Sequence, residues 1–194
     1  MELLLSLALG IGLAAACGFR VFVPALLASG ASVAGWIDPG EGFAWLASYP
    51  AVIALATASA VEVAAYYVPW VDNALDAVAG PLAVIAGATL ASGFIDIDSE
   101  LLRWGIGLLA GGGSAGAVQL GTTLLRGGST ATTGGLANPV VSTGENVAAA
   151  GVAGLAILAP IAAIVAVAAI LFGFVALARR LRGRRRGANP AVGS

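Results

Sequence analysis

The sequence contains no histidine, no lysine and only one cysteine, Cys17. The absence of histidine excludes imidazole acid–base catalysis and histidine metal sites. The absence of lysine excludes Schiff-base chemistry and a Walker-type phosphate-binding loop. A single cysteine forms neither an internal disulfide nor a cysteine metal cluster. We interpret Cys17 as a small packing residue and expect no bound cofactor.

Charged residues are also scarce, because they make up 10% of the 194 residues whereas hydrophobic residues make up 59%. A soluble domain typically has about 25% charged residues. Several apolar runs approach the roughly 20 residues with which a helix crosses a bilayer. The composition therefore predicts an all-α protein, a polytopic membrane helix bundle.

About five membrane spans are predicted, and two of them are expected to be broken. The first segment would be about 48 Å long as a single helix, which exceeds a hydrocarbon core of roughly 30 Å. Gly18, Arg20 and Pro24 mark the expected break in it, and Pro160 marks one in the last segment. The predicted spans are residues 2–34, 51–67, 74–94, 101–125 and 146–178, within a single transmembrane domain of residues 1–178.

The remaining residues, 179–194, form a basic tail, in which six of the nine arginines lie between Arg179 and Arg186. Cytoplasmic flanks of membrane spans carry such an excess, so the C-terminus is expected in the cytoplasm. Counting back through five spans places Arg20 and Arg103 towards the cytoplasm and Arg126 outside. We expect a multi-pass protein of the bacterial inner (plasma) membrane, whose tail contacts anionic lipid and not nucleic acid.

The segment of residues 126–145 is rich in Gly, Ser and Thr and is predicted to be a long loop. Its last four residues, Ser142-Thr-Gly-Glu145, match a capping box, so the next helix is expected to start at Asn146. The simplest role of Glu145 is therefore capping, and Asn138 before a proline is typical of a turn. All three residues, Asn138, Glu145 and Asn146, are also candidates for the substrate or ion pathway.

A weak internal repeat is visible in the sequence. Residues 10–18 and 105–113 are identical at six of nine positions. Many secondary transporters are built from two such halves with broken helices. In a chain so rich in Ala, Gly and Leu, short matches also arise by chance.

Polar residues interrupt the apolar sequence between residues 62 and 76. Steps of four and three residues place Glu62, Tyr66, Asn73 and Asp76 on one helical face, although Pro69 interrupts the helix. A carboxylate inside a membrane span usually faces the bundle interior or a water-filled cavity. The functional interpretation is a polar cavity wall with Glu62 as a protonatable or cation-binding group. The structural interpretation is a neutral Glu62, or one paired with Arg20, that fixes helix packing.

Asp72 and Asp76 have two explanations. They suit the N-cap and the first turn of the third predicted span. They are also one turn apart, as two carboxylates that hold Mg²⁺ and a diphosphate can be, which faintly resembles the acidic motif of membrane prenyltransferases. For Arg20 three roles stay open: pairing with Glu62, binding an anionic substrate, or contacting lipid headgroups at the end of a half-helix.

Three stretches together resemble a known family. They are Ala16-Cys-Gly-Phe-Arg-Val-Phe-Val-Pro24, residues 62–76, and Ala137-Asn-Pro-Val-Val-Ser-Thr-Gly-Glu-Asn146. The family consists of small bacterial integral membrane proteins with a domain of unknown function, and the resemblance covers residues 5–178. It implies a membrane protein and brings no activity or ligand.

The sequence therefore predicts a small membrane transporter or channel for an ion or small polar solute. The expected site combines the break at residues 18–24 with residues 62–76 and 126–146. One alternative is a non-transporting membrane scaffold or accessory subunit, and another is a Mg-dependent lipid-diphosphate enzyme. Membrane lipids are expected partners, and a homodimer is plausible for so small a chain.

Overall fold

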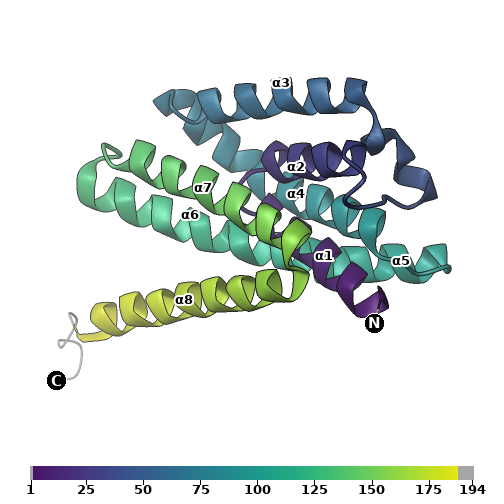
Figure 1. The fold of residues 1–194 in the computed structure, drawn as a ribbon. Helices are drawn as coiled ribbons and strands as arrows, with labels where there is room; N and C mark the ends of the chain where they lie inside the picture. Colours follow the sequence, from purple (N-terminus) through teal and green to yellow (C-terminus); the bar gives the residue numbers. More distant parts are fainter. Residues whose placement is uncertain (1, 188–194) are drawn as a thin grey trace.

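The computed structural model describes residues 2–187, except for the side chains of residues 69, 70, 72, 73, 76 and 181–187. All regular elements of the described chain are helices, as predicted, and these helices pack side by side in a bundle (Figure 1). In chain order the elements are α1 (Glu2–Cys17), α2 (Phe22–Val33), the short 3-10 helix η1 (Glu41–Ala47), α3 (Tyr49–Ala65), α4 (Pro69–Phe94), α5 (Glu100–Ile106), the π-helical η2 (Gly107–Gly112), α6 (Gly113–Thr133), α7 (Asn138–Leu158) and α8 (Pro160–Gly187).

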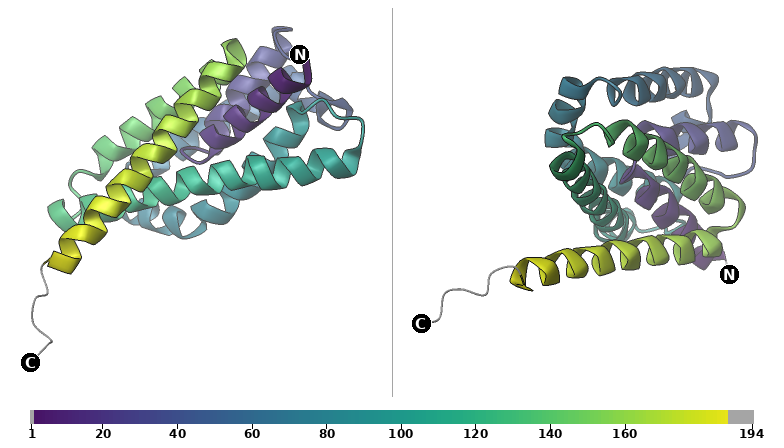
Figure 2. Two further views of the ribbon diagram at one scale, coloured as in Figure 1. Left: turned by 90° about the horizontal axis from the view of Figure 1, so that it is seen from below. Right: turned by 90° about the vertical axis from the view of Figure 1, so that its left-hand side faces the viewer.

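The first apolar segment is broken at residues 18–21, which confirms the predicted interruption. Pro24 lies in the first turn of α2, where a missing N–H costs little because the first helical donors have no partner within the helix. The chain reverses at the break, so α2 returns towards the end at which α1 begins (Figures 1 and 2). The segment thus contains two short antiparallel helices where one broken span was expected.

The last apolar segment is broken at Ala159, directly before Pro160, as predicted. Here too the chain reverses, and α8 returns along the bundle from the end of α7 (Figure 1). Each of these two helices is long and apolar enough to cross a membrane. The predicted single span from residue 146 to residue 178 is therefore two candidate spans.

Among the described residues, three helices satisfy the length and hydropathy of a membrane span: Ala77–Phe94 of α4, α7, and Pro160–Arg180 of α8. A fourth is obtained if η1 and α3, which meet at a bend of 73°, form one span. The chain is thus a multi-pass helical membrane protein. The count of five spans, the internal repeat and the division at residue 178 stay predictions.

The predicted loop at residues 126–145 is wrong, because α6 continues to Thr133 and only residues 134–137 join it to α7. Gly134 and Gly135 have φ of 63° and 89°, which glycine adopts without a steric penalty, so a short turn suffices. The capping box is wrong for the same reason: residues 142–145 lie inside α7. The run of glycines at residues 111–113 does not break the helix but lies at the end of π-helical η2.

The two ends of the bundle differ in charge. The beginning of α1, η1 and the link of residues 95–99 gather at one end, where the Gly40 amide donates to the Gly93 carbonyl at 2.8 Å and the Asp96 amide to the Ser6 hydroxyl at 3.1 Å. The α3–α4 link, the α6–α7 turn and the end of α8 lie at the other end (Figure 1). Most acidic residues belong to the first end, and the arginines of residues 179–186 belong to the second.

These reversals change the expected topology, and cysteine labelling tests it. In a Cys17→Ala background, single cysteines at Leu136 and Arg180 are expected to react from the same side of the membrane. A cysteine at Asp98 is expected to react from the opposite side. Leu136 is 87% exposed in the α6–α7 turn, and Arg180 and Asp98 are also exposed. The topology predicted from the sequence requires positions 136 and 180 to be on opposite sides, and that labelling pattern would contradict the arrangement in Figure 1.

Candidate functional site

Arg20 lies in the turn between α1 and α2 and is almost completely buried, with 2% exposure. Its Nε donates to Asn146 Oδ1 at 2.6 Å, and its Nη1 donates to Glu145 Oε2 at 2.9 Å. Further hydrogen bonds reach the carbonyls of Phe19 at 3.0 Å and Ser142 at 3.3 Å. A buried guanidinium requires such partners, and here they come from its own turn and from α7.

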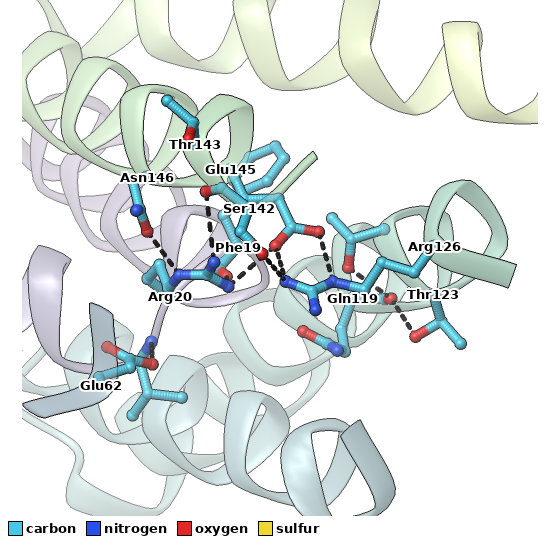
Figure 3. Close-up of polar contacts among 12 residues, drawn as sticks. Phe19, Arg20, Glu62, Gln119, Thr123, Arg126, Ser142, Thr143, Glu145 and Asn146 are labelled. Carbon is cyan, nitrogen blue, oxygen red and sulfur yellow. Dashed lines mark hydrogen bonds and ion pairs between the residues drawn. The ribbon is translucent and has the colours of Figure 1, made fainter. Parts of the chain in front are cut away.

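Glu145 is shared between two arginines (Figure 3). Besides Arg20, it accepts hydrogen bonds from Arg126 of α6, whose Nε lies 3.0 Å from Oε1 and whose Nη2 contacts Oε2. The Nη2 of Arg126 also donates to Ser142 Oγ at 3.1 Å. The side chains of Arg126, Ser142 and Glu145 are all buried. This network of Arg20, Arg126, Ser142, Glu145 and Asn146 joins the α1–α2 turn, α6 and α7.

Tyr66 covers the same network from the end of α3. Its ring centroid lies 3.9 Å from Cζ of Arg20 and 4.5 Å from Cζ of Arg126. A guanidinium at this distance from an aromatic face is attracted by the ring quadrupole. The candidate site residues Arg20, Tyr66, Glu145 and Asn146 are therefore brought together.

Glu62 holds the beginning of α2. Its Oε1 accepts from the Val21 amide at 2.8 Å, and its Oε2 accepts from the Phe22 amide at 3.0 Å. A carboxylate is favoured at a helix N-terminus, where it meets unpaired donors and the positive end of the helix dipole. Figure 3 shows this carboxylate at the turn, while the guanidinium of Arg20 points towards Glu145 and Arg126.

Two of the roles considered for Arg20 are therefore wrong. It does not pair with Glu62, because its ion pair is with Glu145. It does not lie at the lipid headgroups either, because it is buried. The capping role of Glu145 is wrong as well, since Glu145 lies inside α7, where its carboxylate faces the two arginines instead of a helix start.

Asn138, another candidate residue, does not belong to this network. Asn138 begins α7, and its Nδ2 donates to Thr130 Oγ1 at 3.3 Å, away from Arg20 and Glu145. The side chains of Asp72, Asn73 and Asp76 lie outside the described residues. Among the described residues no group of three or more acidic, cysteine or histidine side chains is arranged to hold a metal ion. The Mg²⁺ site at Asp72 and Asp76 stays a prediction.

Beside the turn lies a cleft of about 440 Å³. It separates α3, which packs against α2 and η1, from α4. Glu62 and Arg20 belong to its wall, and Gln119 of α6 also reaches it. A second cavity of about 390 Å³, with a mostly apolar lining, lies between α2 and the end of α7.

Sequence reasoning missed Arg126 and Ser142 as members of the network, because both were assigned to a loop. One signal was present: residues 115–125 are mostly small or apolar, so an arginine that continues the same helix requires a carboxylate partner. Glu145 was the nearest acidic residue further along the chain.

The chain matches a protein family described as a domain of unknown function, DUF4126, over residues 7–180, and it belongs to that family. This confirms the resemblance seen in the sequence. No curated protein and no solved structure matches the chain.

Proposed function

We propose that the protein is a small membrane transporter or channel for an ion or small polar solute, with Glu62 as the charged group of its site. One observation carries this proposal: the Glu62 carboxylate lies in the wall of the 440 Å³ cleft and makes no ion pair among the described residues. Ionisable groups inside membrane proteins usually mark substrate or ion pathways.

The turn between α1 and α2 suits such a site. Non-helical backbone within a membrane protein is tolerated where it is buried in protein or lines a cavity. Residues 18–21 meet both conditions, because Arg20 and Glu62 bind backbone groups of the turn and the turn borders the cleft. Discontinuous helices of this kind form the substrate sites of many transporters.

Glu62 retains capacity for a substrate. Each carboxylate oxygen has two lone-pair positions, and each of these two oxygens accepts one backbone hydrogen bond. The two amides and the dipole of α2 favour the charged form of the carboxylate, which in that form presents a negative charge to a cation in the cleft. The supporting helix α3 is the outer wall of the cleft, and it meets η1 at a bend of 73°.

The test is flux into proteoliposomes across a panel of H⁺, Na⁺, K⁺, organic cations and small polar solutes. Glu62→Gln is expected to abolish the flux that the unchanged protein supports, because Gln cannot carry the charge. Ala58→Phe, which fills the cleft from α3 one helical turn before Glu62, is expected to reduce the same flux strongly. Glu100→Gln is the matched control, because Glu100 is exposed in the first turn of α5 and lies outside the cleft.

Thermal unfolding of each purified variant separates lost transport from lost folding. Full flux in a folded Glu62→Gln protein would exclude Glu62 as the transport group. No flux of any panel member through the unchanged protein would favour the second candidate function, a non-transporting membrane scaffold. The network that joins the α1–α2 turn, α6 and α7 supports that alternative.

A further inference from the structure

The cleft beside Glu62 has an unusual lining for the site of a small inorganic ion. Most of the described lining side chains are apolar, and those from α3 and α4 include Ala54, Ala58, Val61, Leu75, Val78 and Leu82. A hard cation such as Mg²⁺ or Ca²⁺ requires about six or more oxygen ligands, including water. Among the described residues, polar side chains are a minority of the lining, so an ion held by them would keep most of its water in a largely apolar space.

The charges of the cleft favour an organic cation over an anion. Arg20, the cation among the described lining residues, is 2% exposed and is already bound to Glu145, Asn146 and two carbonyls. Within the described part of the chain, the hydrogen-bond partners of Glu62 are the amides of Val21 and Phe22. The carboxylate is therefore the group with capacity for a charged ligand.

The cleft also has a suitable size and entrance. Sites for drug-sized ligands typically have volumes of about 300–1,000 Å³ and mostly apolar walls, and this cleft has about 440 Å³. Its wall includes Val61 of α3, which is 64% exposed and so also reaches the protein surface. An amphipathic molecule dissolved in the bilayer can enter on this side.

We infer that the cleft binds an amphipathic organic cation, with its ammonium or phosphonium group at Glu62 and its apolar body between α3 and α4. This inference specifies the substrate class of the proposed transport site and rests on that proposal for its physiological meaning. The binding itself is a separate property of the cleft and is measured without transport.

The binding experiment uses two ions of the same shape and opposite charge. Purified protein in detergent is titrated with tetraphenylphosphonium and, separately, with tetraphenylborate, and protein-free micelles give the background. Saturable binding is expected for the cation and not for the anion. Loss of a desolvated charge pair weakens binding by about 30-fold or more, so Glu62→Gln is expected to lose that much affinity for the cation. Glu100→Gln is expected to bind like the unchanged protein.

Ala58→Phe provides a second variant in case Glu62→Gln does not fold, since it fills the apolar part and is also expected to prevent binding. Equal affinity for both ions, or unchanged affinity in a folded Glu62→Gln protein, would overturn the inference. Native mass spectrometry gives a further test. If the unchanged protein and Glu62→Gln retain the same phospholipid and neither binds the cation, an acyl chain occupies the cleft and the inference is overturned.

The two proposals fail in different ways. Charge-selective binding of tetraphenylphosphonium without flux of any solute supports the inference and contradicts transport. Glu62-dependent flux of an inorganic ion in a protein that does not bind tetraphenylphosphonium supports transport and contradicts the inference.

Discussion

Replacing Glu145 with glutamine is expected to lower the free energy of unfolding by about 3–5 kcal/mol, the usual cost of removing one partner of a buried ion pair. The carboxylate accepts hydrogen bonds from both Arg20 and Arg126. The glutamine side chain would present an NH₂ group to a guanidinium in place of one oxygen and would leave Arg20 buried without its ion pair. Unfolding of the purified protein in detergent, followed by helical circular dichroism, measures the effect.

Glu100→Gln is the control for this change, because the same substitution at an exposed position is expected to alter stability by no more than about 0.5 kcal/mol. Arg20→Gln combined with Glu145→Gln is expected to cost less than the sum of the two single changes, since the two residues share one interaction. A Glu145→Gln protein as stable as the Glu100→Gln control would show that the network does not hold the helices together.

Gly18→Ala is expected to destabilise the protein by about 1–3 kcal/mol or more, the range for overpacking a close-packed interior. A Cβ at this position would overlap the backbone carbonyl of Ala115 and would lie 2.5 Å from Cβ of Val118. The carbonyl belongs to α6 and cannot move without displacing that helix. Thermal unfolding under the same conditions is the measurement.

Gly30→Ala is the matched control, because Gly30 lies inside α2 and a Cβ there meets no atom within 4 Å. Alanine is a better helix former than glycine by up to about 1 kcal/mol, so this variant is expected to be as stable as the original or more stable. If Gly18→Ala is as stable to thermal unfolding as Gly30→Ala, the α1–α2 turn does not pack closely against α6.

The breaks were predictable because helix length and proline chemistry are local properties. The sequence around Gly18 and Pro24 indicates where the first segment cannot continue, and Pro160 does the same for the last segment. The direction in which the chain leaves each break depends on what it packs against. The reversals from α1 to α2 and from α7 to α8 could therefore be recognised only in the structure.

The helical segment before Thr133 was not predictable from local preference, since Gly, Ser and Thr are poor helix formers. Tertiary packing overrides that preference at Arg126, whose ion pair with Glu145 fixes α6 against α7. The partner of Arg20 could not be identified for a similar reason. A sequence shows that a buried arginine needs an acceptor, but it does not show whether Glu62 or Glu145 lies within reach.

The ion pair of Arg20 also determines the order in which parts of the protein can assemble during synthesis. Its carboxylate partner is 125 residues further along the chain. At about 5–20 residues per second a ribosome needs roughly 6–25 s to add that many residues. Until α7 has left the ribosome, Arg20 has neither Glu145 nor Asn146 and remains costly to place in lipid. The turn at Arg20, although near the start of the chain, is expected to reach its final position only after α7 is inserted.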